Sequence, residues 1–268
     1  MTYLQFLLIF IGIPLLIVAW LNWRDVQRGR KLPDALRAWS VWRVTLAHVM
    51  VAVLYTTPWD NYLVATGVWG YLPERILGIL IGWVPLEEYT FFVVQTLLAG
   101  GWFAWLARRI GEVTQPFKPS IRIRVLLTAP LLAAWLWSLY PLVSGWQPGT
   151  YLALIWVWAL PPMMLQTFFF GDVLWHHRKL AFTVIGSLTL YLSLADTLAI
   201  AQKTWLISET QTLGWLLGGI LPFEEFMFFL MTNTLIGVGM TLILAAQSQT
   251  RVPPIWLARI RRVTGLAK

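Results

Sequence analysis

Two short stretches of the chain place adjacent carboxylates inside long apolar runs. The first is Pro-Leu-Glu-Glu-Tyr-Thr-Phe-Phe at 85–92, and the second is Pro-Phe-Glu-Glu-Phe-Met-Phe-Phe at 222–229. The acidic side chains of the two stretches are Glu87, Glu88, Glu224 and Glu225. A charged carboxylate in hydrocarbon costs several kcal/mol, so this repeated arrangement indicates a functional site.

The two stretches carry groups suited to proton-initiated chemistry on an apolar molecule. Residues four apart share a helix face, which puts one phenylalanine beneath each glutamate: Phe91, Phe92, Phe228 and Phe229. Burial and like-charge neighbours disfavour ionised carboxylates, so we expect at least one of the four to stay protonated at neutral pH. A neutral carboxyl beside aromatic faces is an acid next to groups that stabilise cations. The combination favours protonation of an alkene in a lipid-soluble polyene, followed by carbocation rearrangement.

The repeat also includes two aspartates and two tryptophans. Asp60 precedes Trp69 by nine positions, and Asp196 precedes Trp205 by nine positions. We expect both aspartates at the mouth of a cavity shared by the glutamate pairs, with the tryptophans covering it. Adjacent helical residues point about 100° apart, so only one glutamate of each pair can face a shared point. As alternatives, the glutamates could only stabilise a helix start and the aspartates could only cap helix ends.

Composition identifies the protein class. The chain has 268 residues, of which 58% are hydrophobic and 12% charged, as is typical of a multi-pass membrane protein. The absence of Cys excludes disulfides and thiolate chemistry. The net charge of +8 fits basic cytoplasmic loops and needs no nucleic-acid partner. The three histidines, His48, His176 and His177, do not suggest a metal site.

The apolar runs predict an all-α integral protein of the cell membrane with seven transmembrane helices. They lie at Tyr3–Trp23, Val41–Tyr55 (extending as far as Leu63), Ile76–Ala107, Val125–Tyr140, Tyr151–Phe170, Leu180–Ala201 and Leu213–Ala246. All but two of the 20 Lys and Arg residues follow odd-numbered runs, which predicts an outside N-terminus and a cytoplasmic C-terminus. The third and seventh runs are too long for one crossing and contain Pro85 and Pro222. We expect each to be a short leading segment, a break, and then a full span.

The doubled motif divides the chain into two parallel three-helix repeats joined by a linker helix, a 3+1+3 arrangement. The predicted parts are a first repeat at 1–110, a linker at 111–148 containing the fourth span, a second repeat at 149–246, and a basic cytoplasmic tail at 247–268. Asp172, at the cytoplasmic end of the fifth span, is expected to pair with Arg178 or Lys179.

At these residues the sequence resembles the integral-membrane lycopene cyclases of bacteria, archaea and fungi, which consist of two similar domains. The match lies in the doubled Pro-x-Glu-Glu-x-x-Phe-Phe motif, in the aspartate before each copy and in Gly171–Trp175, and it covers roughly residues 1–245. The resemblance implies cyclisation of the open ψ-ends of lycopene to β-rings without redox change. It implies an acid–base role for the four glutamates and supporting roles for Asp60 and Asp196. The chain has no Gly-x-Gly-x-x-Gly stretch, so we expect no flavin.

Several alternatives remain open at the level of sequence. Related cyclases form ε-rings or act on longer carotenoids, and a 3+1+3 layout is also used by small-solute transporters. A retinal receptor needs a lysine that Leu213–Ala246 lacks, and a prenyltransferase needs Asp-rich motifs that are absent. We expect that changing Glu87 or Glu224 to Gln abolishes ring formation. Sequence does not decide between one ring and two, or fix the oligomeric state.

Overall fold

The computed structural model describes residues 1–255 and is mostly helical. Within this range, seven helical segments are long and apolar enough to cross a membrane, which confirms the predicted all-α composition and the number of spans. The segments are Tyr3–Gln27 (α1, Tyr3–Phe6; the π-helical η1, Leu7–Gly12; α2, Ile13–Gln27), α3 (Val41–Ala65), α4 (Leu86–Ile110), α5 (Ile121–Ser144), α6 (Thr150–His176), α7 (Arg178–Ala201) and α8 (Phe223–Leu244). Much of the predicted tail, from 256 onward, lies outside the described residues.

The remaining elements of the described range are short. The 3-10 turns are η2 (Asp34–Leu36), η3 (Pro73–Arg75) and η4 (Gln147–Gly149), and α9 (Ala246–Gln249) follows α8. The two-residue strands are β1 (Trp69–Gly70), β2 (Leu80–Ile81), β3 (Val84–Pro85), β4 (Leu206–Ile207), β5 (Leu216–Leu217) and β6 (Leu221–Pro222). All of the strands lie in loops before or after the long helices, so they shape the ends of the bundle.

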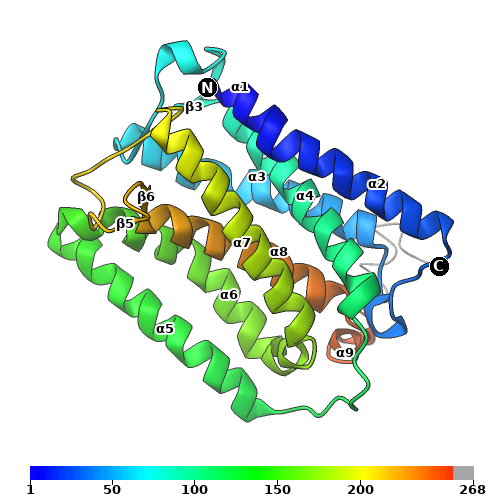
Figure 1. Ribbon diagram of the computed structural model, residues 1–268. Helices are drawn as coiled ribbons and strands as arrows, with labels where there is room; N and C mark the ends of the chain where they lie inside the picture. Colours follow the sequence, from blue (N-terminus) through cyan, green and yellow to red (C-terminus); the bar gives the residue numbers. More distant parts are fainter. Residues whose placement is uncertain (256–268) are drawn as a thin grey trace.

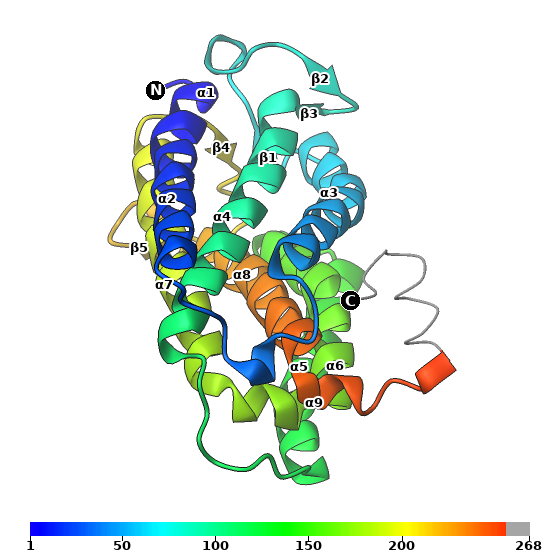
Figure 2. The ribbon, with the colours of Figure 1, turned by 90° about the vertical axis from the view of Figure 1, so that its right-hand side faces the viewer.

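Helices α4 and α8 form the centre of the bundle. Helix α4 packs against α2, α3, α7 and α8, while α8 packs against α6, α7, α3 and α4. Figures 1 and 2 show the other long helices around this pair, with α5 at one outer edge against α6. The Gln95 side-chain amide on α4 donates to the Asn233 oxygen on α8 at 3.1 Å. Since both glutamate pairs begin these two helices, the central packing brings the pairs toward one another.

The third and seventh runs each have a short leading segment before a full span, as predicted. These leading segments are small β-hairpins, β2–β3 and β5–β6. Gly82 and Gly218 lie within these hairpins with φ of +70° and +59°, a backbone conformation that favours glycine. Pro85 and Pro222 are the N-cap residues of α4 and α8, where the missing proline N–H costs no helical hydrogen bond. The prolines therefore mark the start of the full spans.

Two tyrosines link helices that are distant in the sequence: Tyr191 bonds α7 to η1, and Tyr55 bonds α3 to α6. Pro14 and Pro162 lack the N–H that would bond to the carbonyl four residues earlier. Those carbonyls belong to Phe10 and Trp158. Each accepts a 2.8 Å hydrogen bond from a tyrosine hydroxyl, Tyr191 on α7 for Phe10 and Tyr55 on α3 for Trp158. A backbone group freed inside hydrocarbon is thereby satisfied by another helix.

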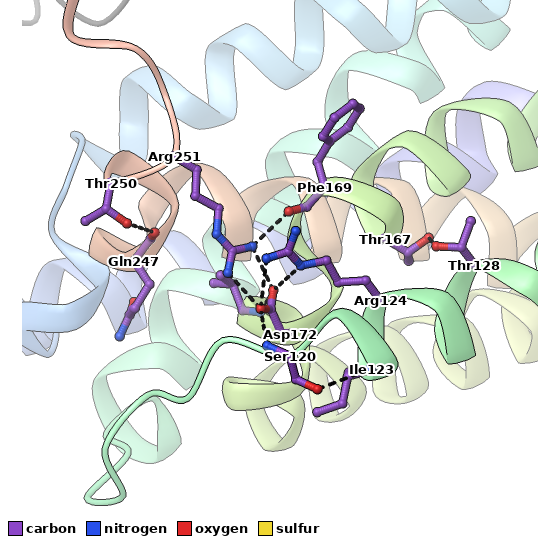
Figure 3. Close-up of polar contacts among 11 residues, drawn as sticks. Ser120, Ile123, Arg124, Thr128, Thr167, Phe169, Asp172, Gln247, Thr250 and Arg251 are labelled. Atoms are coloured by element: carbon purple, nitrogen blue, oxygen red, sulfur yellow. Dashed lines mark hydrogen bonds and ion pairs between the residues drawn. The ribbon is translucent and has the colours of Figure 1, made fainter.

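Asp172, near the end of α6, is the centre of an ionic cluster (Figure 3). The cluster lies at the end of the bundle opposite the glutamates, which are in the first turns of α4 and α8. Arg251 bonds both of its carboxylate oxygens at 2.7 Å, and Arg124 on α5 lies 3.2 Å away. The predicted pairing of Asp172 with Arg178 or Lys179 was wrong. Arg178 instead donates to the Trp175 carbonyl. The cluster ties α5, α6 and the segment after α9 together.

Candidate active site

Two loops meet over the glutamate end of the bundle. Strand β1, after α3, pairs antiparallel with β4, after α7, so that Trp69 is opposite Ile207 and Gly70 is opposite Leu206. Tyr71 follows β1 directly and Trp205 precedes β4 directly. The pairing holds aromatic side chains from both loops above the starts of α4 and α8.

A small cavity of about 20 Å³ lies beneath these loops. One glutamate of each pair lines it, as expected from the 100° angle between neighbours. The lining residues are Tyr3, Phe6, Trp69, Tyr71, Glu88, Phe91, Asp196, Trp205, Glu225, Phe228 and Phe229. These described residues are aromatic or acidic, and none is basic.

Glu88 is held by two tyrosine hydroxyls on a single oxygen. Tyr3 donates to its Oε2 at 2.5 Å and Tyr71 donates to the same atom at 3.0 Å. The two tyrosine rings stack with centroids 6.1 Å apart. Burial, reinforced by the Glu88 carboxyl, raises the pKa of Tyr71 well above its usual range, so the hydroxyl remains a donor at neutral pH. In the described part of the chain, the second oxygen of Glu88 accepts no hydrogen bond.

Glu225 is held in the same manner. Its Oε1 accepts a hydrogen bond from the Tyr151 hydroxyl at 2.8 Å and one from the Trp69 indole N–H at 3.2 Å. Its other oxygen, Oε2, accepts none from residues 1–255. Each of the two carboxyls therefore has one oxygen fixed by two donors and one oxygen without a protein partner, an arrangement suited to proton transfer.

Glu87 and Glu224 do not line the cavity. Glu87 accepts a hydrogen bond from the Leu77 N–H at 2.5 Å, and Glu224 accepts one from the Leu213 N–H at 2.7 Å. Both donors lie in the segments just before the hairpins. The first glutamate of each pair therefore anchors the loop that leads into its own helix.

Asp60 and Asp196 are both fully buried, and they differ in their surroundings. Both lie within helices, before the ends of α3 and α7 at Ala65 and Ala201, so neither caps a helix end. Asp196 lines the cavity and accepts a hydrogen bond from the Trp205 indole at 3.0 Å. Asp60 does not line it, and among the described residues neither of its oxygens has a hydrogen-bond donor.

Most of the expected aromatic residues reach the cavity. Phe91, Phe228 and Phe229 line it together with Trp69 and Trp205. Phe92 is buried outside the lining and contacts the ring of Tyr89 at 6.0 Å between centroids. The aromatic faces lie on α4, α8 and the two loops, so they surround the acidic groups from several sides.

The three tyrosines on the glutamates were not predicted from the sequence. The signal was present in the spacing: Tyr3 and Tyr151 are 148 positions apart, as are Pro14 and Pro162. This spacing exceeds the 136 positions between Asp60 and Asp196. The loop after the first helix, absent between α6 and α7, accounts for the difference. A search at one fixed spacing misses these residues.

Comparison with known proteins identifies relatives along most of the chain. The lycopene β-cyclase of Halobacterium salinarum (strain ATCC 29341 / DSM 671 / R1) is 36% identical over 244 residues, covering 90% of this chain and 95% of that protein. The bifunctional lycopene cyclase/phytoene synthase of Podospora anserina is 36% identical over 200 residues, covering 72% of this chain and 33% of that protein. A protein of the same name from Phaffia rhodozyma is 30% identical over 221 residues, 77% of this chain and 32% of that protein.

The chain thus spans about a third of these fungal relatives and nearly all of the archaeal one. No family model matches the sequence, and no solved structure matches it.

Proposed function

Because this chain belongs to the lycopene cyclase family, we propose that it cyclises the open ψ-ends of lycopene to β-rings within the membrane. The observation that carries the proposal is the shared cavity lined by Glu88 and Glu225. These two carboxyls come from different central helices, and aromatic rings surround them. The arrangement offers a proton donor, a proton acceptor and faces that stabilise a cation, as cyclisation of a polyene end requires.

The reaction is an isomerisation, and the proposed roles balance its protons. One carboxyl protonates C2 of the end group, which leaves a tertiary cation at C1. The neighbouring double bond attacks C1, a ring forms, and the positive charge moves to C5. The other carboxylate removes the proton from C6 and the β-ring double bond results. The proton gained equals the proton lost, so no oxidant or reductant takes part.

The environment favours a state in which one of Glu88 and Glu225 is protonated and the other is ionised. Charged groups buried without a cation are costly, and the described lining contains no basic residue. Two ionised carboxylates in one such space repel one another, so a state with a single shared negative charge is favoured. We propose that Asp196, which accepts a hydrogen bond from the Trp205 indole, supports this pair. Glu87 and Glu224 keep the proposed acid–base site in shape by anchoring their loops.

We also propose the finer architecture of the enzyme. Residues 1–110 and 149–246 form parallel repeats around the linker at 111–148, with the N-terminus outside, a basic tail at 247–268 in the cytoplasm, and the protein in the cell membrane. Matched residues support the repeat, because Tyr55 and Tyr191 are separated by the same 136 positions as the two aspartates. The excess of Lys and Arg after odd-numbered spans supports the orientation.

The test is expression in cells that accumulate lycopene, with pigments separated by chromatography and identified by mass. Cyclic products keep the mass of lycopene and absorb at shorter wavelength. We expect Glu88→Gln and Glu225→Gln each to lower ring formation by at least about 100-fold, since positioned acids and bases contribute 10²–10⁴-fold. The sequence alone predicts that Glu87→Gln or Glu224→Gln abolishes ring formation. Because neither side chain lines the cavity, we expect these matched variants instead to retain more activity than Glu88→Gln and Glu225→Gln. Unchanged lycopene with wild-type protein present in the membrane would refute the proposed function.

A further inference from the structure

The cavity has two flanks that are built from equivalent elements. On the first flank, α1 and η1 lie beside α7, where Tyr191 donates to the Phe10 carbonyl. On the second flank, α6 lies beside α3, where Tyr55 donates to the Trp158 carbonyl. We name these the α1–α7 flank and the α3–α6 flank. Each runs from the glutamate region toward the lipid-facing surface, because Tyr191 and Tyr55 are 37% and 43% exposed.

One position differs strongly between the flanks. Trp59 lies four residues after Tyr55, so both face α6 from the same side of α3. Ala195 lies four residues after Tyr191 and faces α1 and η1 from α7 by the same geometry. The residue before each aspartate therefore carries an indole on the α3–α6 flank (Trp59) and a methyl group on the α1–α7 flank (Ala195).

Trp59 closes the α3–α6 flank. Its ring stacks on Trp158 at 4.6 Å between centroids and on Phe228 at 5.8 Å. Its indole N–H donates to the Leu154 carbonyl at 3.0 Å, which fixes the ring across the gap between α3 and α6. With the Tyr55 hydrogen bond one turn away, α3 is bonded to two α6 carbonyls that lie one turn apart, those of Leu154 and Trp158.

The cavity correspondingly extends toward the α1–α7 flank. Tyr3, Phe6 and Trp205 line it from this flank, together with Asp196. Tyr151 and Asp60, the counterparts of Tyr3 and Asp196, do not line it, whereas Trp69, the counterpart of Trp205, does. The π-helical turn η1 borders the α1–α7 flank, and such turns occur often at functional sites.

We propose that the open end of the polyene enters and reacts from the α1–α7 flank only, because Trp59 blocks the α3–α6 flank, whereas Ala195, which is 3% exposed, places only a methyl group at the matching position. This inference rests on the proposed function. Ala195 and Trp59 are then specificity-determining residues that select one of two equivalent routes to Glu88 and Glu225. The two ends of one lycopene react in succession through the same route, and a monocyclic molecule must leave and turn before its second end enters.

The test uses the absence of cysteine in the chain, which gives an introduced thiol a unique reactivity. Ala195→Cys is a small change, and the folded variant in membranes can be treated with benzyl methanethiosulfonate to place an aromatic group on the α1–α7 flank. We expect at least a tenfold loss of cyclisation rate after modification, and recovery after dithiothreitol. The matched control is Leu194→Cys, whose side chain is 60% exposed on the same helix and should be modified without loss of rate.

The outcomes separate the two proposals. If the wild-type protein forms no ring, the proposed function fails and the flank assignment fails with it. If wild-type protein and unmodified Ala195→Cys form rings, and mass analysis shows complete modification with more than half the rate retained, only the flank assignment is overturned. Failure of folded Ala195→Cys to react would also overturn it, because a flank closed to the reagent is closed to a polyene end. Reversible loss cannot arise from misfolding, which removes that ambiguity.

Discussion

The tyrosines on Glu88 and Glu225 provide a way to distinguish the proton donor from the proton acceptor. Tyr3 donates to Glu88 and Tyr151 donates to Glu225, and a change to Phe removes only the hydroxyl. An acid gains negative charge as it gives up its proton, so a hydrogen bond to it strengthens in the transition state. A base loses negative charge, so its hydrogen bond weakens. We expect the Tyr→Phe change to slow the reaction at the acid, and to leave the rate unchanged or raise it at the base.

The expected size follows from the hydrogen bonds involved. A hydrogen bond to a charged group contributes about 1.5–3 kcal/mol and a bond between neutral groups about 0.5–1.5 kcal/mol. The difference of about 1–1.5 kcal/mol corresponds to a roughly 5–13-fold decrease in kcat. Each carboxyl keeps a second donor, Tyr71 on Glu88 and Trp69 on Glu225, so it stays oriented in either variant. The effect should therefore appear in kcat, with KM nearly unchanged.

The assay is initial-rate cyclisation in membranes at varied lycopene concentration, with kcat and KM determined separately for Tyr3→Phe and Tyr151→Phe. Tyr55→Phe is the control, since it removes a hydroxyl bonded to a helix carbonyl away from the glutamates. Rates within twofold of wild type in both variants would refute the reasoning. A rise in KM alone would do so too, because it would indicate substrate binding instead of carboxyl tuning.

Three further predictions concern stability in detergent. Gln95→Leu and Asn233→Leu should each cost about 1–2 kcal/mol, because each leaves one polar atom of the buried pair without its partner. The double variant should cost less than the sum of the two, as a thermal double-mutant cycle would measure. Asp172→Asn should lower the free energy of unfolding by about 2–3 kcal/mol, because the guanidinium groups of Arg124 and Arg251 lose the negative charge that they share. Arg251→Gln should lower it by less, because Arg124 still pairs with Asp172. Equal melting temperatures of the two variants would contradict this prediction. Burial lowers the pKa of His177 to about 4, below its unfolded value of about 6.5. The free energy of unfolding should therefore be highest above pH 6.5 and fall by about 1.4 kcal/mol per pH unit between pH 6.5 and pH 4. Melting curves of His177→Gln should lack this pH dependence.

Sequence predicted the helical composition and the residues with chemistry, because hydropathy and buried charge are both local signals. Seven runs matched seven helices, and one glutamate of each pair was expected to face a common point. The sequence-based prediction singled out Glu87 and Glu224 as the residues whose change to Gln abolishes ring formation. Glu88 and Glu225 face the cavity, whereas Glu87 and Glu224 turn to loop N–H groups, a choice set by the phase of helices that begin directly after proline.

Other features depended on contacts between distant segments and could not be deduced from local pattern. The apolar residues before Pro85 read equally well as a helix or as a hairpin, and glycine turns decided in favour of the hairpin. The partner of Asp172 proved to be Arg251, which approaches from another part of the chain and not from the following turn. The catalytic roles of the glutamates and aspartates remain predictions for the experiments above.

The proline-freed carbonyls have a consequence for biogenesis. The donor for Trp158 is Tyr55, which is synthesised earlier, so this acceptor meets its partner as soon as its helix enters the bilayer. The donor for Phe10 is Tyr191, which the ribosome adds 181 residues later. At about 5–20 residues per second, the first helix waits roughly 10–40 s in the membrane for that hydroxyl. The flank proposed as the substrate entrance would then be the later of the two to close during synthesis.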